Sequence, residues 1–331
     1  MNDRVTWLLP VRNGMPYLPE TLASIEAQTY HNWEILVWDD GSTDGTLEEL
    51  EKWIPSRLPG KIFTGESLGV GGALARLVEA CETELCARID ADDINLPKRL
   101  EKQVAYMQKH PEITVLGSAM YRINEQGDRY KYSYRFPQHH DNIVILLLSE
   151  TCIGHPSVMF RKSAILDIGN YCSLPKVEDY DLWLRVASHY KLANLPEFLV
   201  EYRIRSNSET QIVKQENRIE EVMRTCLYQH VEILFGCSVQ DMALLVEKQH
   251  PNPIKILLKI LFFLKKSQGG SWIGRLLSDS FFRVSKNVLE SGNLPAQIAL
   301  AMLEILPSTL IRKFLQLPHR FIFKFSSGLP G

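Results

Sequence analysis

Residues 34–42 read EILVWDDGS, and this stretch decides the fold that the sequence predicts. Its first half, residues 34–38, is a short apolar run that ends abruptly in two carboxylates, a glycine and a serine. A brief apolar run bounded by turn residues is typical of a strand inside a covered parallel sheet. Residues 46–53 continue with a helical pattern, so the stretch predicts one unit of strand, polar loop and helix.

The same unit recurs on both sides of this stretch. Residues 5–9 predict a strand that Pro10 and Gly14 end, and residues 85–89 predict a strand that ends at Asp90. This repetition predicts an α/β fold in which helices flank a mostly parallel sheet. Further patterns predict helices over 19–28, 96–109, 162–168 and 179–189, a glycine-rich loop over 69–72, and strands over 61–64, 114–117, 157–161 and 193–202.

Polar side chains follow three of the predicted strands. In an open α/β sheet the ligand crevice lies beyond the carboxyl ends of the strands. The sequence separates these polar clusters widely, but the topology should gather them on one rim. A single acidic turn is usually a solvated loop, whereas three converging clusters favour a site. The clusters are Arg12 with Asn13, Asp39 with Asp40, and Asp90 with Asp92 and Asp93.

Asp90 and Asp92 are separated by Ala91 on the turn after a strand. A leaving diphosphate needs its charge neutralised, and Mg²⁺ or Mn²⁺ does so while bound by one or two carboxylates, phosphate oxygens and water. In this interpretation Asp92 holds the metal, and Asp90 binds a ribose hydroxyl or assists the metal. Two aspartates at this spacing occur by chance in many loops, so the pattern needs support from the surrounding motifs.

Five stretches together resemble the inverting family-2 glycosyltransferases, which have the Rossmann-like GT-A fold. The resemblance covers roughly residues 4–205, before a helical C-terminal extension. It is closest to the bacterial enzymes that build O-antigen, capsule and exopolysaccharide repeat units. The stretches are LPVRNG (9–14), EILVWDDGSTDGT (34–46), ARIDADDINLPKRL (87–100), HPSVMFRK (155–162) and EDYDLWLR (178–185).

The resemblance implies a role for each matching position. Asp40 would read the uracil of the donor or its equivalent, whereas Asp39 would brace the loop. Asp92 would bind Mn²⁺ or Mg²⁺, with Asp90 beside the ribose. Arg88 would hold phosphate or the aspartate loop, or would be a strand residue paired with a carboxylate. The implied donor site comprises Pro10, Val11, Arg12, Asn13, Asp40, Arg88, Asp90, Ala91 and Asp92.

Asp179 would be the catalytic base according to the resemblance. Inverting transfer needs a group that takes the proton from an acceptor hydroxyl, and a positioned carboxylate contributes about 10²–10⁴-fold in this way. Asp179 also lies at a predicted helix start, so the alternative is an N-cap, for which Asp is favoured. Glu178 would assist, and Asp181 fits a structural pairing with Arg185 four residues later.

His155 and Trp183 are candidates for contacts with the sugar or the acceptor. The resemblance places His155 near the sugar or the acceptor, and the alternative is a buried, hydrogen-bonded histidine before a proline turn. Trp183 lies on the apolar side of the helix predicted over 179–189.

Two stretches depart from the usual pattern of this family, and a glycine pair resembles another motif. Arg12 stands where the family usually has an aromatic residue, and residues 67–69 read SLG where Asn-x-Gly is usual. Gly71 and Gly72 look like part of a phosphate-binding loop, but no lysine follows, which argues against an NTPase P-loop. The departures leave the fine recognition of the donor open and do not change the class of enzyme.

The composition fits a folded protein with an acidic body and a basic tail. The chain has 331 residues, of which 45% are hydrophobic and 23% charged, so the disordered and fibrous classes are excluded. Residues 251–331 carry eleven Lys or Arg and three Asp or Glu, which leaves 26 basic and 36 acidic residues before them. We expect a catalytic domain over 1–207 and a helical, basic region over 208–331.

The six cysteines are scattered without CxxC spacing, which argues against zinc or a disulfide framework and favours buried thiols in a reducing cytosol. The N-terminus has no charged-then-apolar leader, and no run approaches the ~20 apolar residues of a membrane span. We therefore expect a cytoplasmic protein.

Residues 253–266 read PIKILLKILFFLKK, with Lys255, Lys259 and Lys266 near one face. This pattern resembles an interfacial amphipathic helix with a basic face, and residues 315–325 repeat the aromatic and basic mixture. A lipid-linked acceptor at the anionic inner face of the cytoplasmic membrane would explain both features. The alternatives are a helical bundle packed on the catalytic domain and a homodimer interface.

The expected reaction is an inverting displacement at the anomeric carbon of a nucleotide-diphosphate sugar, with UDP as the expected nucleotide. The acceptor would be a hydroxyl of a lipid-linked oligosaccharide, and nothing indicates nucleic acid. One rival is a metal-dependent nucleotidyltransferase, which would favour a first loop richer in glycine than residues 9–14. The other is a catalytically silent assembly partner, against which the intact Asp40, Asp92 and Asp179 argue.

Overall fold

The computed structural model describes residues 3–147, 151–172, 177–205 and 219–246. The chain divides into two units, Met1–His230 and Val231–Gly331, and each is described by itself. The expected boundary between residues 207 and 208, the predicted amphipathic helix over 253–266 and the basic stretch over 315–325 lie outside the described residues. These three expectations stay predictions.

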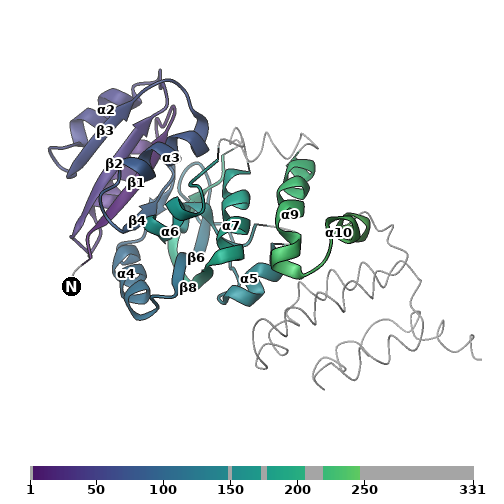
Figure 1. Cartoon of the computed structure of the whole chain (residues 1–331). Helices are drawn as coiled ribbons and strands as arrows, with labels where there is room; N and C mark the ends of the chain where they lie inside the picture. The colour runs from purple at the N-terminus through teal and green to yellow at the C-terminus, as the bar shows by residue number, and fades with distance from the viewer. Residues whose placement is uncertain (1–2, 148–150, 173–176, 206–218, 247–331) are drawn as a thin grey trace, which may run out of the picture. The chain divides into compact units, whose positions relative to one another are not determined.

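An eight-stranded sheet forms the framework of the first unit, in the order β3-β2-β1-β4-β7-β6-β8-β5 (Figure 1). The four strands from β3 to β4 are parallel, β7 is antiparallel to its neighbours, β8 is parallel to β6, and β5 is antiparallel to β8. The predicted α/β fold with a mostly parallel sheet is confirmed. The strands are β1 (Val5–Val11), β2 (Trp33–Asp39), β3 (Gly60–Thr64), β4 (Leu85–Arg88), β5 (Ile94–Asn95), β6 (Ile113–Ile123), β7 (Met159–Arg161) and β8 (Lys191–Arg203).

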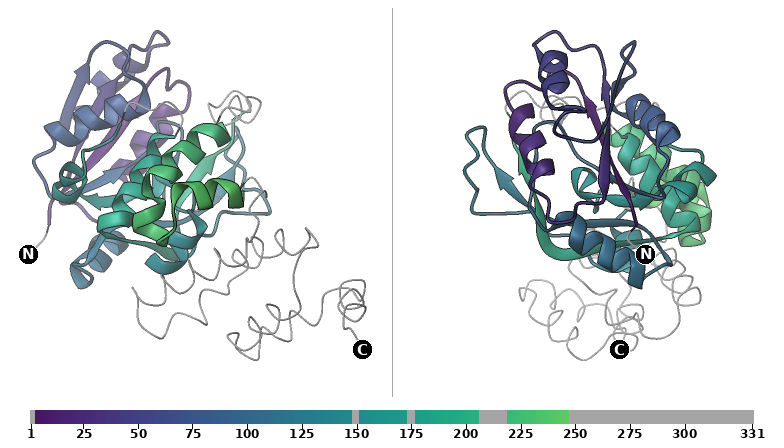
Figure 2. Two further views of the ribbon diagram at one scale, coloured as in Figure 1. Left: turned by 45° about the vertical axis from the view of Figure 1, so that its right-hand side comes forward. Right: turned by 90° about the vertical axis from the view of Figure 1, so that its left-hand side faces the viewer.

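Helices cover both faces of this sheet. α3 packs on β1 and β2 and contacts α6 and α7, whereas α1 packs on β5 and contacts α2. Figure 2 shows α1 and α3 on opposite sides of the strands. The helices are α1 (Leu18–Glu26), α2 (Thr46–Trp53), α3 (Gly69–Ala80), α4 (Arg99–Lys109), α5 (His140–Leu146), the 3-10 helix η1 (His155–Ser157), α6 (Lys162–Asp167) and α7 (Glu178–His189).

Two more helices follow the sheet. α9 (Ile219–Phe235) contains the division between the two units, and α10 (Val239–Val246) belongs to the second unit. Both helices lie within the region over 208–331 for which the sequence predicts helices. Within the described ranges, no helix combines the length and the apolar character that crossing a membrane requires.

β1 is buried along its whole length and continues through Pro10 to Val11, so the prediction that Pro10 ends this strand is wrong. The carbonyl of Val11 accepts a hydrogen bond from the Asp40 amide, so this carbonyl points toward β2. Backbone groups alternate along a strand, so the nitrogen of Pro10 faces the β4 side, where pairing with β1 stops at Leu8. The missing N–H therefore removes no hydrogen bond of the sheet.

The prediction of a glycine-rich loop over 69–72 is also wrong, because α3 begins at Gly69 and the glycines lie in its first turn. The reason is close packing. A Cβ at Gly71 would clash with the carbonyl oxygen of Cys172 and lie 3.1 Å from the Cβ of Glu178. Glycine at this position lets α3 approach the start of α7 at the distance that the site requires.

Candidate active site

The predicted polar clusters lie at the same edge of the sheet. β2 and β4 both pair with β1 in parallel, so the loops after Val11, Asp39 and Arg88 open in one direction. The register places Val11 beside Asp39 and Leu8 beside Arg88. The topology thus brings together the three clusters that the sequence separates.

The first two loops are bonded to each other by the side chains of residues 42–46. Ser42 Oγ, Thr46 Oγ1 and Asp44 Oδ2 accept hydrogen bonds from three successive backbone amides of the first loop, at 2.8–2.9 Å. Asn13 returns one bond, because its Oδ1 accepts from the Thr43 amide at 2.9 Å. Sequence reasoning missed this role, although the run of hydroxyl and carboxylate residues in 42–46 was the available signal. The three amides belong to Asn13, Gly14 and Met15.

Asp40 is buried and accepts hydrogen bonds at both carboxylate oxygens. Its donors are Ser67 Oγ at 2.9 Å and the amides of Leu68 at 2.6 Å and Gly69 at 2.9 Å, together with Trp38 Nε1 at 3.3 Å. The three shorter bonds fix Asp40 at the start of α3, where helix amides favour a negative charge. Residues 67–69 therefore supply backbone and hydroxyl donors where the family usually has an asparagine.

The other candidates of the donor side lie around this anchor. Arg12 is exposed and donates to Ser67 Oγ at 3.0 Å, so it joins the first loop to the loop that binds Asp40. Asp39 accepts from the Ser42 amide at 3.2 Å, which is a bracing contact within its own loop. Pro10 and Val11 are buried in β1, where only their backbone faces the rim, and Ala91 is half-buried.

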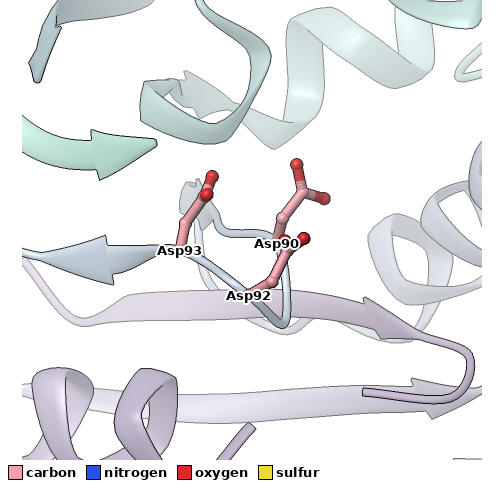
Figure 3. A group of neighbouring side chains, drawn as sticks. All are labelled: Asp90, Asp92 and Asp93. Carbon is pink, nitrogen blue, oxygen red and sulfur yellow. The ribbon is translucent and has the colours of Figure 1, made fainter. Parts of the chain in front are cut away.

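Three carboxylates gather on the loop after β4, and Figure 3 shows Asp90 and Asp93 pointing to the same side of that loop. One carboxylate oxygen from each of Asp90, Asp92 and Asp93 lies within 4.8 Å of the other two. Hard cations such as Mg²⁺ and Mn²⁺ prefer oxygen ligands of this kind. Asp93 Oδ2 is buried and has no hydrogen-bond partner among the described residues. The donor set and this orphaned oxygen fit a divalent cation.

The carboxylate cluster holds more negative charge than its surroundings neutralise. Burial is the main cause that raises the pKa of Asp92, and the neighbouring Asp90 raises it further. Burial also raises the pKa of Asp93 well above its ordinary value, with Asp92 and Asp90 as the next causes. A divalent cation would remove this repulsion, which is a second reason why it fits.

Two arginines supply part of the missing positive charge. Arg88 is buried at the end of β4 and grips Asp90 with two nitrogens, one of them at 2.7 Å from Asp90 Oδ2. Arg205 Nε lies 2.7 Å from Asp92 Oδ2, an ion pair without the angle of a good hydrogen bond. Arg88 is thus a strand residue paired with a carboxylate, Asp90, whereas Asp92 is paired with Arg205.

Arg203, at the end of β8, supports the cluster from behind. Its amide donates to Asp93 Oδ1 at 2.8 Å, and its Nε donates to the carbonyl of Asp92 at 2.8 Å. The same guanidinium donates to the carbonyls of Asn124 and Glu125. Sequence reasoning missed Arg203 and Arg205, because only the register of β8 brings them to a loop that lies more than a hundred residues earlier.

Asp179 lies in the first turn of α7, and its Oδ1 accepts a hydrogen bond from the Tyr180 amide at 2.7 Å. The capping position is Val177, which has no side-chain capping bond, so Asp179 does not take the N-cap position. Burial raises the pKa of Asp179, while the Tyr180 amide and Arg88 oppose the rise. A carboxylate with a raised pKa is better matched to proton abstraction near neutral pH.

Asp181 is bonded to Arg185, which donates to its Oδ2 from two nitrogens at 2.8 and 2.6 Å. The expected structural pairing is confirmed. Arg185 also donates to the carbonyls of Ile168 and Asn170, so it fixes the chain that leads to the start of α7. Glu178 is half-buried, and its Cβ lies close to Gly71 of α3.

His155 is buried, and its Nε2 lies 3.0 Å from the hydroxyl of Tyr171. Burial lowers the pKa of His155 well below its ordinary value, with Arg88 as the second cause, so the ring is neutral at pH 7. Trp183 is fully buried and meets His155 edge to face, with ring centroids 5.7 Å apart. Trp183 is therefore a buried partner of His155 and not an exposed surface for a sugar or an acceptor.

A mostly parallel sheet with carboxylates at its strand ends defines the class of GT-A glycosyltransferases, as the sequence predicted. Among solved structures, the Staphylococcus aureus TarS fragment 1–349 in complex with UDP-GlcNAc superposes with a TM-score of 0.53. It is 20% identical and the match covers 78% of this chain and 80% of that one, which shows a shared fold.

The family description "Glycosyl transferase family 2" matches residues 6–168. The Escherichia coli O-antigen biosynthesis glycosyltransferase WbnJ is 33% identical over 210 residues, which are 62% of this chain and 82% of that protein. The Erwinia amylovora amylovoran biosynthesis glycosyltransferase AmsE is 36% identical over 193 residues, 57% of this chain and 71% of that protein. The chain belongs to glycosyltransferase family 2 and is a transferase enzyme.

Proposed function

We propose that this enzyme transfers a sugar from a nucleotide-diphosphate donor, with UDP as the nucleotide, to a hydroxyl of a lipid-linked oligosaccharide in surface polysaccharide synthesis. The observation that carries the proposal is the meeting of the Asp90–Asp93 cluster with Asp179 around the buried Arg88, which is paired with Asp90 and lowers the pKa of Asp179. The names of the two bacterial relatives support the polysaccharide setting, and the UDP-GlcNAc complex of TarS supports the donor class.

On the donor side, Asp40 and the bonded first and second loops hold the nucleotide. Asp40 already accepts four hydrogen bonds, so a base edge can bind it only by replacing one of them. The 3.3 Å bond from Trp38 Nε1 is the longest and is the one that we expect to be exchanged. Arg12, which is exposed beside Ser67, takes the place of the aromatic residue that borders the base in most relatives.

Asp92 and Asp90 would hold Mn²⁺ or Mg²⁺, and the buried Asp93 adds negative charge to the same site. A cation bound there would supply positive charge that neutralises the leaving diphosphate. Arg205, which is paired with Asp92, adds a further positive charge beside this site. Arg88 keeps Asp90 in place throughout, because it grips both carboxylate oxygens.

On the acceptor side, Asp179 takes the proton from the attacking hydroxyl. The new bond forms between that oxygen and the anomeric carbon, while the bond from the anomeric carbon to the diphosphate oxygen breaks. Attack from the side opposite the leaving group inverts the configuration of the sugar. Glu178 lies next to Asp179, and His155 is the neutral group placed to hold the sugar or the acceptor by a hydrogen bond.

The setting at the membrane rests on sequence alone. The basic region 208–331 would dock on an anionic inner leaflet, which places the enzyme at the periphery of the cytoplasmic membrane and near a lipid-linked acceptor. Flotation of the full chain with vesicles of anionic or zwitterionic lipid tests this. A variant with Lys255, Lys259 and Lys266 changed to Glu should lose its preference for anionic vesicles, and equal flotation of both proteins would overturn the membrane role. Mass measurement in solution tests the homodimer alternative.

The central experiment measures nucleotide release from a panel of nucleotide sugars with Mn²⁺ or Mg²⁺. We expect UDP release for at least one donor in the wild type and its loss in Asp92→Asn. Release of pyrophosphate from a nucleoside triphosphate and a sugar phosphate would instead indicate a nucleotidyltransferase. Absence of both activities, with Asp92→Asn indistinguishable from wild type, would favour the silent assembly partner.

A further inference from the structure

An exposed aromatic segment follows the turn at residues 124–128. The chain folds back along β6 there, with bridges from Ile123 to Arg129 and from Met120 to Tyr134. Three tyrosines in five residues are exposed, Tyr130 by 44%, Tyr132 by 71% and Tyr134 by 36%. Exposed aromatic side chains that gather in one place usually mark a binding surface.

Five of the side chains here form a continuous row. The Arg122 guanidinium lies 5.3 Å from the ring centre of Tyr130 and 5.4 Å from that of Tyr134, so it sits between the two rings. Tyr134 meets Tyr202 edge to face at 6.0 Å, and it lies nearly parallel to Phe136 at 6.2 Å. We call these five residues, Arg122, Tyr130, Tyr134, Phe136 and Tyr202, the aromatic row.

The row begins beside the active site. A Cβ at Gly154 would lie 2.5 Å from Met120 Cε and 3.1 Å from Phe136 Cε2, so the chain just before His155 touches the inner end of the row. Tyr202 directly precedes Arg203, which is bonded to the carbonyl of Asp92. The inner end of the row therefore lies beside the segment that carries His155.

The chemistry of the row fits pyranose rings. The C–H face of a sugar ring packs on an aromatic ring, and its hydroxyl edge needs hydrogen-bond donors and acceptors. Arg122 is half-buried beside the rings of Tyr130 and Tyr134, and its guanidinium and the tyrosine hydroxyls supply polar groups. The exposed large apolar side chains of this segment are all tyrosines, which suits a saccharide better than an acyl chain.

We infer that the aromatic row binds the sugar units of the acceptor that lie beyond the unit whose hydroxyl attacks. The inference rests on the proposed function and adds to it a place and a chemical class for the acceptor. The enzyme reads the length of an oligosaccharide through this row, while Asp179 and His155 act on the terminal unit alone.

The test uses the full-length enzyme with acceptors of graded length. The probes are polyprenyl-diphosphate-linked mono-, di- and trisaccharides of glucose, galactose and N-acetylglucosamine. Tyr134→Ala should raise the KM for the di- and trisaccharides by about three- to ten-fold, since an aromatic contact contributes about 0.5–1.5 kcal/mol beyond area burial. The KM for the monosaccharide and for the donor should not change.

Two control variants separate the row from its surroundings. Tyr132→Ala removes the most exposed tyrosine, whose ring lies near Lys131 and outside the row, and it should leave every KM unchanged. Tyr134→Phe keeps the ring and loses only the hydroxyl, so it should raise the KM for the di- and trisaccharides by less than Tyr134→Ala does. An equal rise in both variants would contradict a role for the ring.

Donor hydrolysis without acceptor separates the two proposals. If the wild type releases no nucleotide from any donor, the proposed function fails first. If nucleotide is released but Tyr134→Ala changes no acceptor KM, or raises it equally for all three lengths, the inference about the row is overturned. A loss of binding to anionic vesicles without a change in KM would assign the row to lipid and would also overturn it.

Discussion

Two acidic loops lie at the same rim of the sheet, on either side of β1, and their carboxylates have opposite surroundings. In the loop after β2, Asp40 accepts four hydrogen bonds and Asp44 accepts bonds from Met15 and Thr46. In the loop after β4, Asp93 keeps one oxygen without a partner among the described residues. We call the loop after β2 the saturated loop, because protein donors satisfy its carboxylate oxygens, and the loop after β4 the unsaturated loop.

The pKa shifts follow the same division. Although burial raises the pKa of Asp44, the hydrogen bonds from Thr46 and Met15 outweigh it and lower that pKa. Burial raises the pKa of Asp92 and of Asp93, and repulsion by Asp90 adds to both rises. Two aspartate-rich loops that look alike in sequence can therefore differ in role: the carboxylates of one stabilise the fold, and those of the other are available for binding.

The largest expected effect belongs to Asp179, which faces the unsaturated loop. Asp179→Asn should reduce sugar transfer by about 10²–10⁴-fold, because the amide cannot take the acceptor proton. Donor affinity, measured by calorimetry, should stay within a factor of about two. Asp44→Asn is the matched control in the saturated loop, and it should alter transfer by less than about ten-fold. A comparable loss in both variants would abolish the proposed division of roles.

The pH dependence of transfer gives the next largest effect. Asp179 is active as the ionised base, and its raised pKa means that it becomes protonated at a higher pH than an ordinary aspartate. Transfer at limiting substrate should therefore fall about ten-fold per pH unit below that pKa and level off above it. Profiles of kcat/KM against pH check this. An acid limb at the ordinary aspartate pKa, or an unchanged limb in Asp179→Asn, would count against Asp179 as the base.

Stability should distinguish the loops directly. Asp40→Asn should lower the free energy of unfolding by about 2 kcal/mol, since hydrogen bonds to a buried charged group contribute about 1.5–3 kcal/mol. Asp92→Asn should leave that free energy unchanged or raise it, because it removes a charge that its neighbours repel. Urea titrations without divalent metal measure both values. Equal losses in the two variants would show that the comparison is wrong.

The smallest expected effect concerns Arg205, which competes with a cation for Asp92. The Arg205–Asp92 pair is partly buried, so it should be worth at least the ~0.2–1 kcal/mol of an exposed pair, and Arg205→Ala should raise the affinity for Mn²⁺ by about five-fold. Calorimetric titration of Mn²⁺ without donor reads this independently of activity. Arg12→Ala, at an exposed arginine of the saturated side, should leave Mn²⁺ affinity as it is. A weaker Mn²⁺ affinity in Arg205→Ala would refute the competition.

Much of the site could be predicted from sequence because parallel strands impose it. The carboxyl ends of β1, β2 and β4 meet at one edge, so Arg12, Asp40 and Asp90 had to be neighbours once the strands were assigned. The start of α7 at Glu178 and the pairing of Asp181 with Arg185 also follow from local pattern. Local periodicity and strand order were sufficient for these residues.

Other contacts depend on register and packing, which local pattern does not encode. Arg203 and Arg205 reach the carboxylate cluster only because β8 pairs with β6 and β5 in the observed register. The glycines of 69–72 suggested a loop, but they lie in the first turn of α3, and Gly71 allows the close approach of α3 to Cys172. The residues of the aromatic row come from β6, β8 and the segment after the turn at 124–128. None of these stretches predicts the row by itself.

The glycine at position 71 also bears on how such an enzyme can diversify. Because any side chain there would push the donor half away from the start of α7, this position should be nearly intolerant in a saturation mutagenesis screen for transfer. The exposed tyrosines of the aromatic row carry no comparable constraint, and they can be replaced without disturbing the reaction centre. New acceptor preferences can then arise by substitution of these surface tyrosines, while the spacing of the catalytic groups stays the same.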